Sequence, residues 1–284
     1  MLATAIIVFR EVLEAALVVS IVLAATRGVS RRGLWVGSGV LGGALGATAV
    51  AWFADAIAAA ASGVGQELFN AAVLFVAVIM LGWHNVWMSR HGRELASSLK
   101  SVGAAVRGGT SPMHVLAAVV GMAVLREGSE LVLFLYGVAA SASGESSGMF
   151  AGALIGVGAG AVTGAALYLG LLRIPSSRLF TVTGWMILLL AAGMAAQGAA
   201  FLVQADILPS LGESVWDTTA LLADDGVPGR VLHTLIGYTA RPDGIQLLFY
   251  LVTLGAIIAL MKIVNRIPRV GIVPAARTAG QPSR

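Results

Sequence analysis

The sequence has 284 residues, of which 58% are hydrophobic and only 11% are charged. Soluble domains contain about 45–50% apolar and about 25% charged residues, so most of this chain is expected to lie in lipid. The absence of cysteine excludes disulfides, thiolate metal sites and redox thiols. A pI near 10.0 does not indicate nucleic acid binding, because 14 of the 18 Lys and Arg residues flank apolar segments.

Seven apolar segments are long enough to cross about 30 Å of hydrocarbon, which takes roughly 20 helical residues. They fall near 2–25, 34–61, 67–88, 114–140, 149–172, 179–204 and 244–265. The first lacks the basic start of a signal peptide and is interrupted by charges, so it is interpreted as a retained span. The sequence predicts an all-α integral membrane protein with seven transmembrane helices.

Basic residues follow every second span, which indicates the orientation of the chain. They are Arg27, Arg31, Arg32, Arg90, Arg93, Lys100, Arg107, Arg173, Arg178, Lys262, Arg266, Arg269, Arg277 and Arg284. The intervening connections carry only Arg230 and Arg241, together with seven acidic residues. Because Lys and Arg accumulate in cytoplasmic connections, the N-terminus is predicted outside and the C-terminus in the cytoplasm.

The polytopic permease domain is predicted to cover residues 1–265. Its outer connection, 206–243, is punctuated by proline and glycine and contains stretches that suit short surface helices, and the last helix covers about 244–265. Residues 266–284 form a basic cytoplasmic tail that suits a surface of anionic membrane lipid.

Two three-helix halves, about 1–110 and about 111–205, resemble each other. The first span of each half contains Arg-Glu-x-x-Glu, at Arg10–Glu14 and at Arg126–Glu130. These spans run in opposite directions, so the halves are predicted to be inverted repeats whose motifs face each other.

Glycines recur every four residues on the second span of each half. They are Gly39, Gly43, Gly42, Gly46, Gly152, Gly156, Gly160 and Gly164. Small residues at this spacing let helices approach closely, within one bundle or in a homo-oligomer.

The two motifs carry the chemistry that the sequence offers. A charged side chain at the bilayer centre costs at least about 2.5–3.5 kcal/mol. Two matching clusters of three such residues therefore indicate a function. Arg10 and Arg126 each lie four residues before a Glu, the spacing of a helical ion pair. Pairing for insertion would explain one Glu per Arg, and each motif has a second. We therefore expect a four-carboxylate site for a hard cation, supported by the two arginines. Its carboxylates belong to Glu11, Glu14, Glu127 and Glu130.

The chain resembles the oxidase-dependent iron transporter family, which includes fungal high-affinity iron permeases and bacterial ferrous/ferric uptake permeases. The resemblance rests on both motifs and on Gln66–Phe69, Trp83–Met88, Trp216–Asp217 and Ile236–Tyr238. It implies iron uptake, as Fe2+ or Fe3+, across the cytoplasmic membrane without a cofactor. It also implies a periplasmic or extracellular iron oxidase or iron-binding protein as partner.

Other polar residues receive weaker predictions. Glu67 and Asp55 are candidates for the outer mouth of the ion path, while Asn70 stands where many relatives carry a further Glu. Three aspartates of the outer connection could attract cations or simply be solvated: Asp217, Asp224 and Asp225. Three histidines at or beyond cytoplasmic helix ends are expected to be surface groups, with a role as ligands at the exit as the alternative: His84, His91 and His114. His233 is isolated in the outer connection.

Three alternative functions remain open at this point. The cargo could be another cation, such as Pb2+, Mn2+ or protons alone. An integral-membrane enzyme could use paired glutamates, although no His or Cys is expected at mid-span, so we do not predict an enzyme. Third, the chain could be a purely structural membrane subunit, with neither transport nor enzymatic activity.

Overall fold

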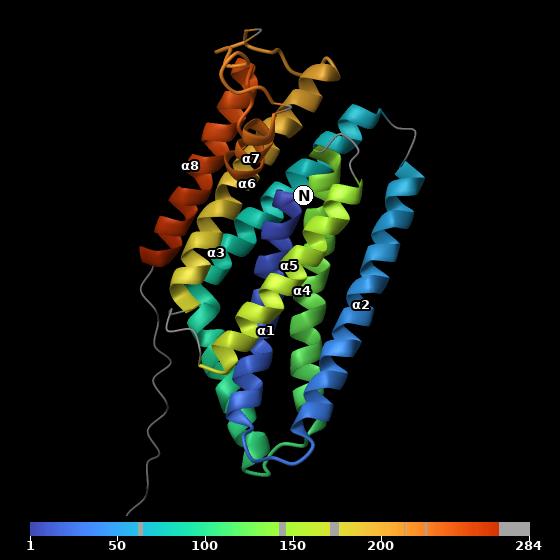
Figure 1. The fold of residues 1–284 in the computed structure, drawn as a ribbon, viewed down its shortest axis with the longest axis vertical. Coiled ribbons are helices and arrows are strands. Elements are labelled where there is room, and N and C mark those ends of the chain that lie inside the picture. Colours follow the sequence, from blue (N-terminus) through green and yellow to red (C-terminus); the bar gives the residue numbers. More distant parts are fainter. Residues whose placement is uncertain (62–64, 142–145, 171–175, 213, 225, 267–284) are drawn as a thin grey trace, which may run out of the picture.

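The computed structural model describes residues 1–284 except 62–64, 142–145, 171–175, 213, 225 and 267–284. Its described residues form eight helices and no strand. The helices are α1 (Leu2–Ala25), α2 (Arg32–Ala61), α3 (Gln66–Arg107), α4 (His114–Ser141), α5 (Ser146–Tyr168), α6 (Ser176–Gln204), α7 (Val227–Ile236) and α8 (Gly244–Arg266). Figure 1 shows them as one elongated bundle.

Five helices are long and apolar enough to cross a membrane, namely α2, α3, α5, α6 and α8. The helices α1 and α4 have 24 and 28 residues, and each carries the three charged residues of its motif. The fold is therefore all-helical and suited to several membrane crossings. The seven-span count and the orientation stay predictions.

The third helix is much longer than its predicted apolar span. Its apolar part, Gln66–Met88, agrees with the prediction, but the helix continues to Arg107. At about 1.5 Å per residue it is roughly 60 Å long, about twice the hydrocarbon thickness. The basic stretch after Met88 therefore continues the same helix beyond the apolar span, because polar side chains end an apolar run without ending a helix.

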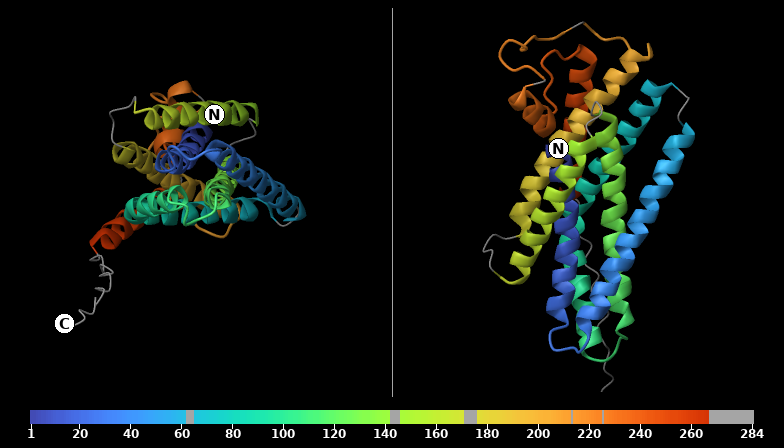
Figure 2. Two further views of the ribbon diagram at one scale, coloured as in Figure 1. Left: turned by 90° about the horizontal axis from the view of Figure 1, so that it is seen from below. Right: turned by 45° about the vertical axis from the view of Figure 1, so that its right-hand side comes forward.

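The helices pair across the two halves of the sequence. Helix α1 packs mainly on α5, and α2 packs mainly on α4, while α3 packs on α6. Figures 1 and 2 show α2 and α8 on opposite sides of the bundle. Each motif helix is thus held by the glycine-rich helix of the other half.

Glycine makes these two contacts possible. A Cβ built on Gly156 of α5 would lie 2.7 Å from the carbonyl oxygen of Ala5 on α1. A Cβ on Gly43 of α2 would lie 2.6 Å from the carbonyl oxygen of Gly121 on α4. Any larger residue would push the paired backbones apart. The predicted close packing is confirmed here, except that Gly42 has no atom within 4 Å and takes no part.

Two apolar clusters enclose the level of the motifs. One contains Ile7 of α1 and Phe134 of α4, together with parts of α3 and α6. The other contains Val18 of α1 and Val120 of α4, together with the far end of α3. The motif residues lie between these clusters along both helices. They are therefore placed in the interior of the bundle, with apolar packing before and after them.

The outer connection folds back onto the bundle. Helix α7 ends at Ile236 and is followed by Gly237, whose φ is +68°. A Cβ on Gly237 would lie 2.4 Å from Cα of Gly193 on α6. The carboxylate of Asp217 pairs with Arg241 at 2.8 Å, and this contact lowers the pKa of Asp217 below its ordinary value. Asp224 accepts a hydrogen bond from the backbone N–H of Ala240 at 2.9 Å. Both aspartates thus hold the connection together.

Candidate functional site

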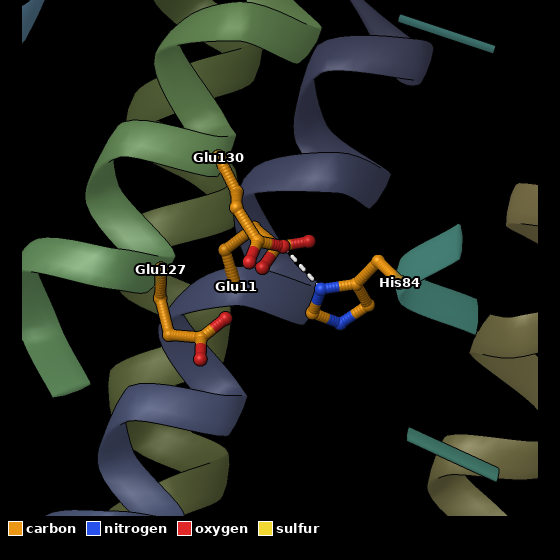
Figure 3. A group of neighbouring side chains, drawn as sticks. All are labelled: Glu11, His84, Glu127 and Glu130. Atoms are coloured by element: carbon orange, nitrogen blue, oxygen red, sulfur yellow. Dashed lines mark ion pairs between the residues drawn. The ribbon is translucent and has the colours of Figure 1, made fainter. Parts of the chain in front are cut away.

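Side chains from three helices meet between the apolar clusters. Glu11 comes from α1, His84 from α3, and Glu127 and Glu130 from α4 (Figure 3). One oxygen or nitrogen of each residue lies within 4.8 Å of the corresponding atom of every other. Residues far apart in the sequence therefore present four potential ligand atoms to one small volume.

The α1 motif is sealed inside the protein. Arg10 Nε lies 3.0 Å from Glu14 Oε1 in an ion pair, and its Nη1 donates to Glu11 Oε1 across 3.4 Å. The exposed fractions of these side chains are 3% for Arg10, 4% for Glu14 and 1% for Glu11. The predicted helical ion pair is confirmed, and the arginine contacts both carboxylates of its motif.

The α4 motif makes the same pair in a more open setting. Arg126 donates from Nε to Glu130 Oε1 across 3.0 Å, and the same nitrogen lies 3.9 Å from Glu127 Oε1. The Arg126 side chain is 39% exposed, and its guanidinium carbon lies 4.4 Å from the centre of the Trp87 ring. A cation over an indole face is stabilised by the ring quadrupole. Trp87 therefore covers the open edge of the site.

His84 joins the two motifs and corrects a prediction. Its side chain is only 2% exposed, its Nε2 lies 3.4 Å from Glu14 Oε2, and its Nδ1 contacts Glu130 Oε2. The expectation that His84 is a surface group at a helix end was wrong, as was the expectation that no histidine lies at the level of the motifs. The length of α3 explains this, because residue 84 lies near the middle of a helix that ends at Arg107.

A signal for this position exists in the sequence. Residues 89–107 contain no proline, and Gly108-Gly109 follows them. Gly109 has a φ of +72°, a conformation typical of the end of a helix. A helix that continued to this glycine pair would have placed His84 in its interior.

Several acceptor atoms of the site lack donors. Oε2 of Glu11 and Oε2 of Glu127 are buried and have no hydrogen-bond partner among the described residues. A buried carboxylate oxygen without a donor is costly, so these oxygens suit contact with a cation. With all six motif side chains ionised, four carboxylates face two guanidiniums and the motifs together are doubly negative. The arrangement suits a divalent cation.

Glu14 differs from the other three glutamates. One of its oxygens lies against Arg10 and the other against His84. Its carboxylate is not part of the group whose ligand atoms converge. The structure thus brings three of the four expected carboxylates together and sets the fourth behind the imidazole.

The residues predicted for the outer mouth lie away from this group. Glu67 is exposed in the first turn of α3, and Asp55 is exposed on α2, where it accepts a hydrogen bond from the Tyr136 hydroxyl at 3.1 Å. Asn70 is half-buried. Their role in ion uptake stays a prediction.

Neither of the other two histidines whose side chains the structure describes belongs to the group. His114 is exposed at the first residue of α4, and His233 of α7 contacts the carbonyl oxygen of Tyr238 through Nδ1 at 2.7 Å. The side chain of His91 and all of Asp225 lie outside the described residues.

Comparison with known proteins gives consistent matches along the chain. The model of the iron permease FTR1 family matches residues 1–271. The ferrous iron permease EfeU of Yersinia pestis is 29% identical over 275 residues, which cover 95% of this chain and 96% of that protein. EfeU of Escherichia coli O6:H1 is 32% identical over 244 residues, which cover 84% and 86%. No solved structure gives a significant match. The chain therefore belongs to the iron permease FTR1 family, and it is a multi-pass membrane protein.

Proposed function

We propose that this protein takes up iron, as Fe2+, across the cytoplasmic membrane through the group formed by α1, α3 and α4. The observation that carries the proposal is the convergence of Glu11, Glu127, Glu130 and His84 within 4.8 Å, in a chain of the iron permease family. Three carboxylates and an imidazole form a donor set that ferrous iron accepts. The name of the relatives, ferrous iron permease, agrees with this choice.

The helix pairing suggests how the ion could be released. The ligands come from two tightly packed pairs, since Glu11 belongs to α1–α5 and Glu127 and Glu130 belong to α2–α4. A movement of one pair relative to the other would separate these carboxylates and weaken ion binding. The crossed pairing also supports the inverted repeat, because each half then supplies one motif helix and one glycine-rich helix.

The direction of transport follows from the predicted orientation. With the N-terminus outside, iron arrives on the side of α7, passes the level of Asp55 and Glu67, and leaves towards the basic ends of the helices. The doubly negative motifs would attract the cation, and the membrane potential would favour its inward movement. We further propose delivery by a periplasmic or extracellular iron-binding protein or oxidase, as the family resemblance implies.

Purified protein in liposomes tests the proposal. We would measure uptake of radiolabelled Fe2+ kept reduced, comparing wild type with a Glu11→Gln/Glu127→Gln double variant. Because this variant keeps the side-chain shapes but removes two anionic ligands, uptake should fall at least about 10-fold. Glu94→Gln is the matched control, since Glu94 is exposed on α3.

Three outcomes would contradict the proposal. Wild-type uptake by the double variant would exclude this group as the ion site. Absence of any metal uptake by the wild-type protein alone would favour a structural subunit, and equal import of Mn2+ would favour a general divalent cation transporter.

A further inference from the structure

The imidazole of His84 is the one nitrogen donor in a group that otherwise offers carboxylate oxygens. Oxygen ligands alone suit Mg2+, Ca2+ and Mn2+ as well as iron, so three glutamates would discriminate poorly. Imidazole binds Fe2+ well and adds little for Mg2+ or Ca2+, and affinity for a given site generally rises from Mn2+ to Fe2+. The imidazole therefore favours Fe2+ over the cations that prefer oxygen ligands.

Glu14 lies beside one nitrogen of the His84 ring. Glu14 Oε2 lies 3.4 Å from Nε2 of His84, while Glu14 Oε1 is held by Arg10 at 3.0 Å. A carboxylate on one ring nitrogen sets the tautomer and turns the other nitrogen towards a metal, a common arrangement in metalloproteins. Nδ1, the other nitrogen, points to Glu130 and into the converging group (Figure 3).

The neighbouring residue fixes the rotation of the helix itself. Asn85 donates from its side-chain amide to the carbonyl oxygen of Gly184 on α6 across 3.1 Å. A Cβ on Gly184 would lie 3.0 Å from Asn85 Oδ1, so glycine leaves room for this contact. With Asn85 held against α6, His84 is directed to the opposite neighbours, α1 and α4.

We propose that His84 binds ferrous iron through Nδ1 and makes the site select Fe2+ over Mn2+, Mg2+ and Ca2+. Glu14 is then a positioning residue, which orients the imidazole while Glu11, Glu127 and Glu130 supply the oxygens. This inference rests on the proposed function and adds the residue that determines its specificity.

Metal selectivity is the measurement that a merely structural role would leave unchanged. Binding of Fe2+ and Mn2+ to purified protein in nanodiscs, without oxygen, would be compared for wild type and His84→Gln. Fe2+ affinity should fall about 10–100-fold, whereas Mn2+ affinity should fall less than about 3-fold. His114→Gln is the matched control, because His114 is exposed and outside the group. An equal fall for both metals would overturn the ligand role.

A measurement on the unaltered protein covers the case in which His84→Gln does not fold. X-ray absorption at the iron edge of wild type with one equivalent of Fe2+ should show the outer-shell scattering of a coordinated imidazole. A spectrum with oxygen ligands alone would overturn the proposal.

The positioning role of Glu14 has its own test. Glu14→Gln keeps an oxygen that can accept from Nε2, so it should retain the imidazole scattering and the preference for Fe2+ over Mn2+. Losses of Fe2+ and Mn2+ binding as large as those caused by Glu127→Gln would show that Glu14 is itself a ligand.

These results separate the inference from the function on which it rests. If wild type imports iron and the Glu11→Gln/Glu127→Gln variant does not, but His84→Gln changes both metals equally, only the inference fails. If wild type neither binds nor imports iron, the proposed function fails.

Discussion

The two Arg-Glu-x-x-Glu motifs make the same ion pair in different surroundings. The Nε to Oε1 distance is 3.0 Å in both, yet the arginine side chain is 3% exposed in α1 and 39% exposed in α4. Arg10 is enclosed by protein, whereas Arg126 lies under Trp87 at an open edge. The four-residue spacing within each helix therefore produces the Arg–Glu ion pair. The packing of the helices determines how deeply each pair is buried, and so how much each charge needs its partner.

This difference assigns distinct tasks to the motifs. The charges of the α1 motif have no access to solvent and must neutralise one another, so this motif anchors the interior. If the proposed function holds, the more exposed α4 motif is the side from which we expect the site to exchange an ion. Substitutions at matched positions of the two motifs test this difference in burial.

The largest difference is expected between Arg10→Ala and Arg126→Ala. Removing Arg10 leaves two buried carboxylates without their cation, which should lower the free energy of unfolding by about 3–5 kcal/mol. Removing Arg126, which is 39% exposed, should cost less than this, because Glu130 is itself 16% exposed and keeps its contact with His84. Denaturant unfolding in detergent measures both values. Equal losses would contradict the conclusion that the α1 motif depends more on its buried arginine than the α4 motif does.

The glycine contacts behind each motif should show the next largest effect. Gly156→Ala on α5 and Gly43→Ala on α2 both force a Cβ against a neighbouring backbone oxygen, at a cost of about 1–3 kcal/mol. Gly158→Ala and Gly42→Ala on the same helices meet open space and should be neutral or slightly stabilising. Thermal unfolding of the four variants provides the test. A similar loss in the Gly158 and Gly42 variants would show that helix flexibility, rather than close packing, requires glycine.

A smaller effect is expected at Trp87 of α3, which contacts the arginine of the α4 motif. Trp87→Leu should lower the free energy of unfolding by about 0.5–1 kcal/mol more than Trp87→Phe, because only Phe keeps an aromatic face for Arg126. In an Arg126→Gln background this difference should disappear. A persistent difference would attribute the effect to packing of the ring instead of to the cation.

The smallest effect is expected at the exposed hydrogen bond between Tyr136 and Asp55. Tyr136→Phe and Asp55→Asn should each change the free energy of unfolding by less than about 0.5 kcal/mol. Uptake at low iron concentration then addresses the predicted role of Asp55 at the outer mouth. A loss with Asp55→Asn but not with Tyr136→Phe would support it, and unchanged uptake in both would remove Asp55 from the ion path.

Much of the site was predictable because it is local. The spacing of Arg10 and Glu14, and of Arg126 and Glu130, places each pair on one helix face whatever surrounds it. The four-residue spacing of Gly39 with Gly43, and of Gly156 with its neighbours, likewise identifies contact faces. Apolar length gave the approximate positions of the membrane-spanning helices.

Only the tertiary structure decided which of these faces meet, and how deeply each is buried. It placed His84 between the motifs, set Glu14 behind the imidazole, and sealed Arg10 while leaving Arg126 half-exposed. Helical periodicity fixes neighbours within about one turn, whereas contacts between α1, α3 and α4 depend on the rotation and axial shift of whole helices. The amino-acid sequence was therefore enough to identify the glutamates and the arginines paired with them. The position of His84 beside them depends on how distant helices pack.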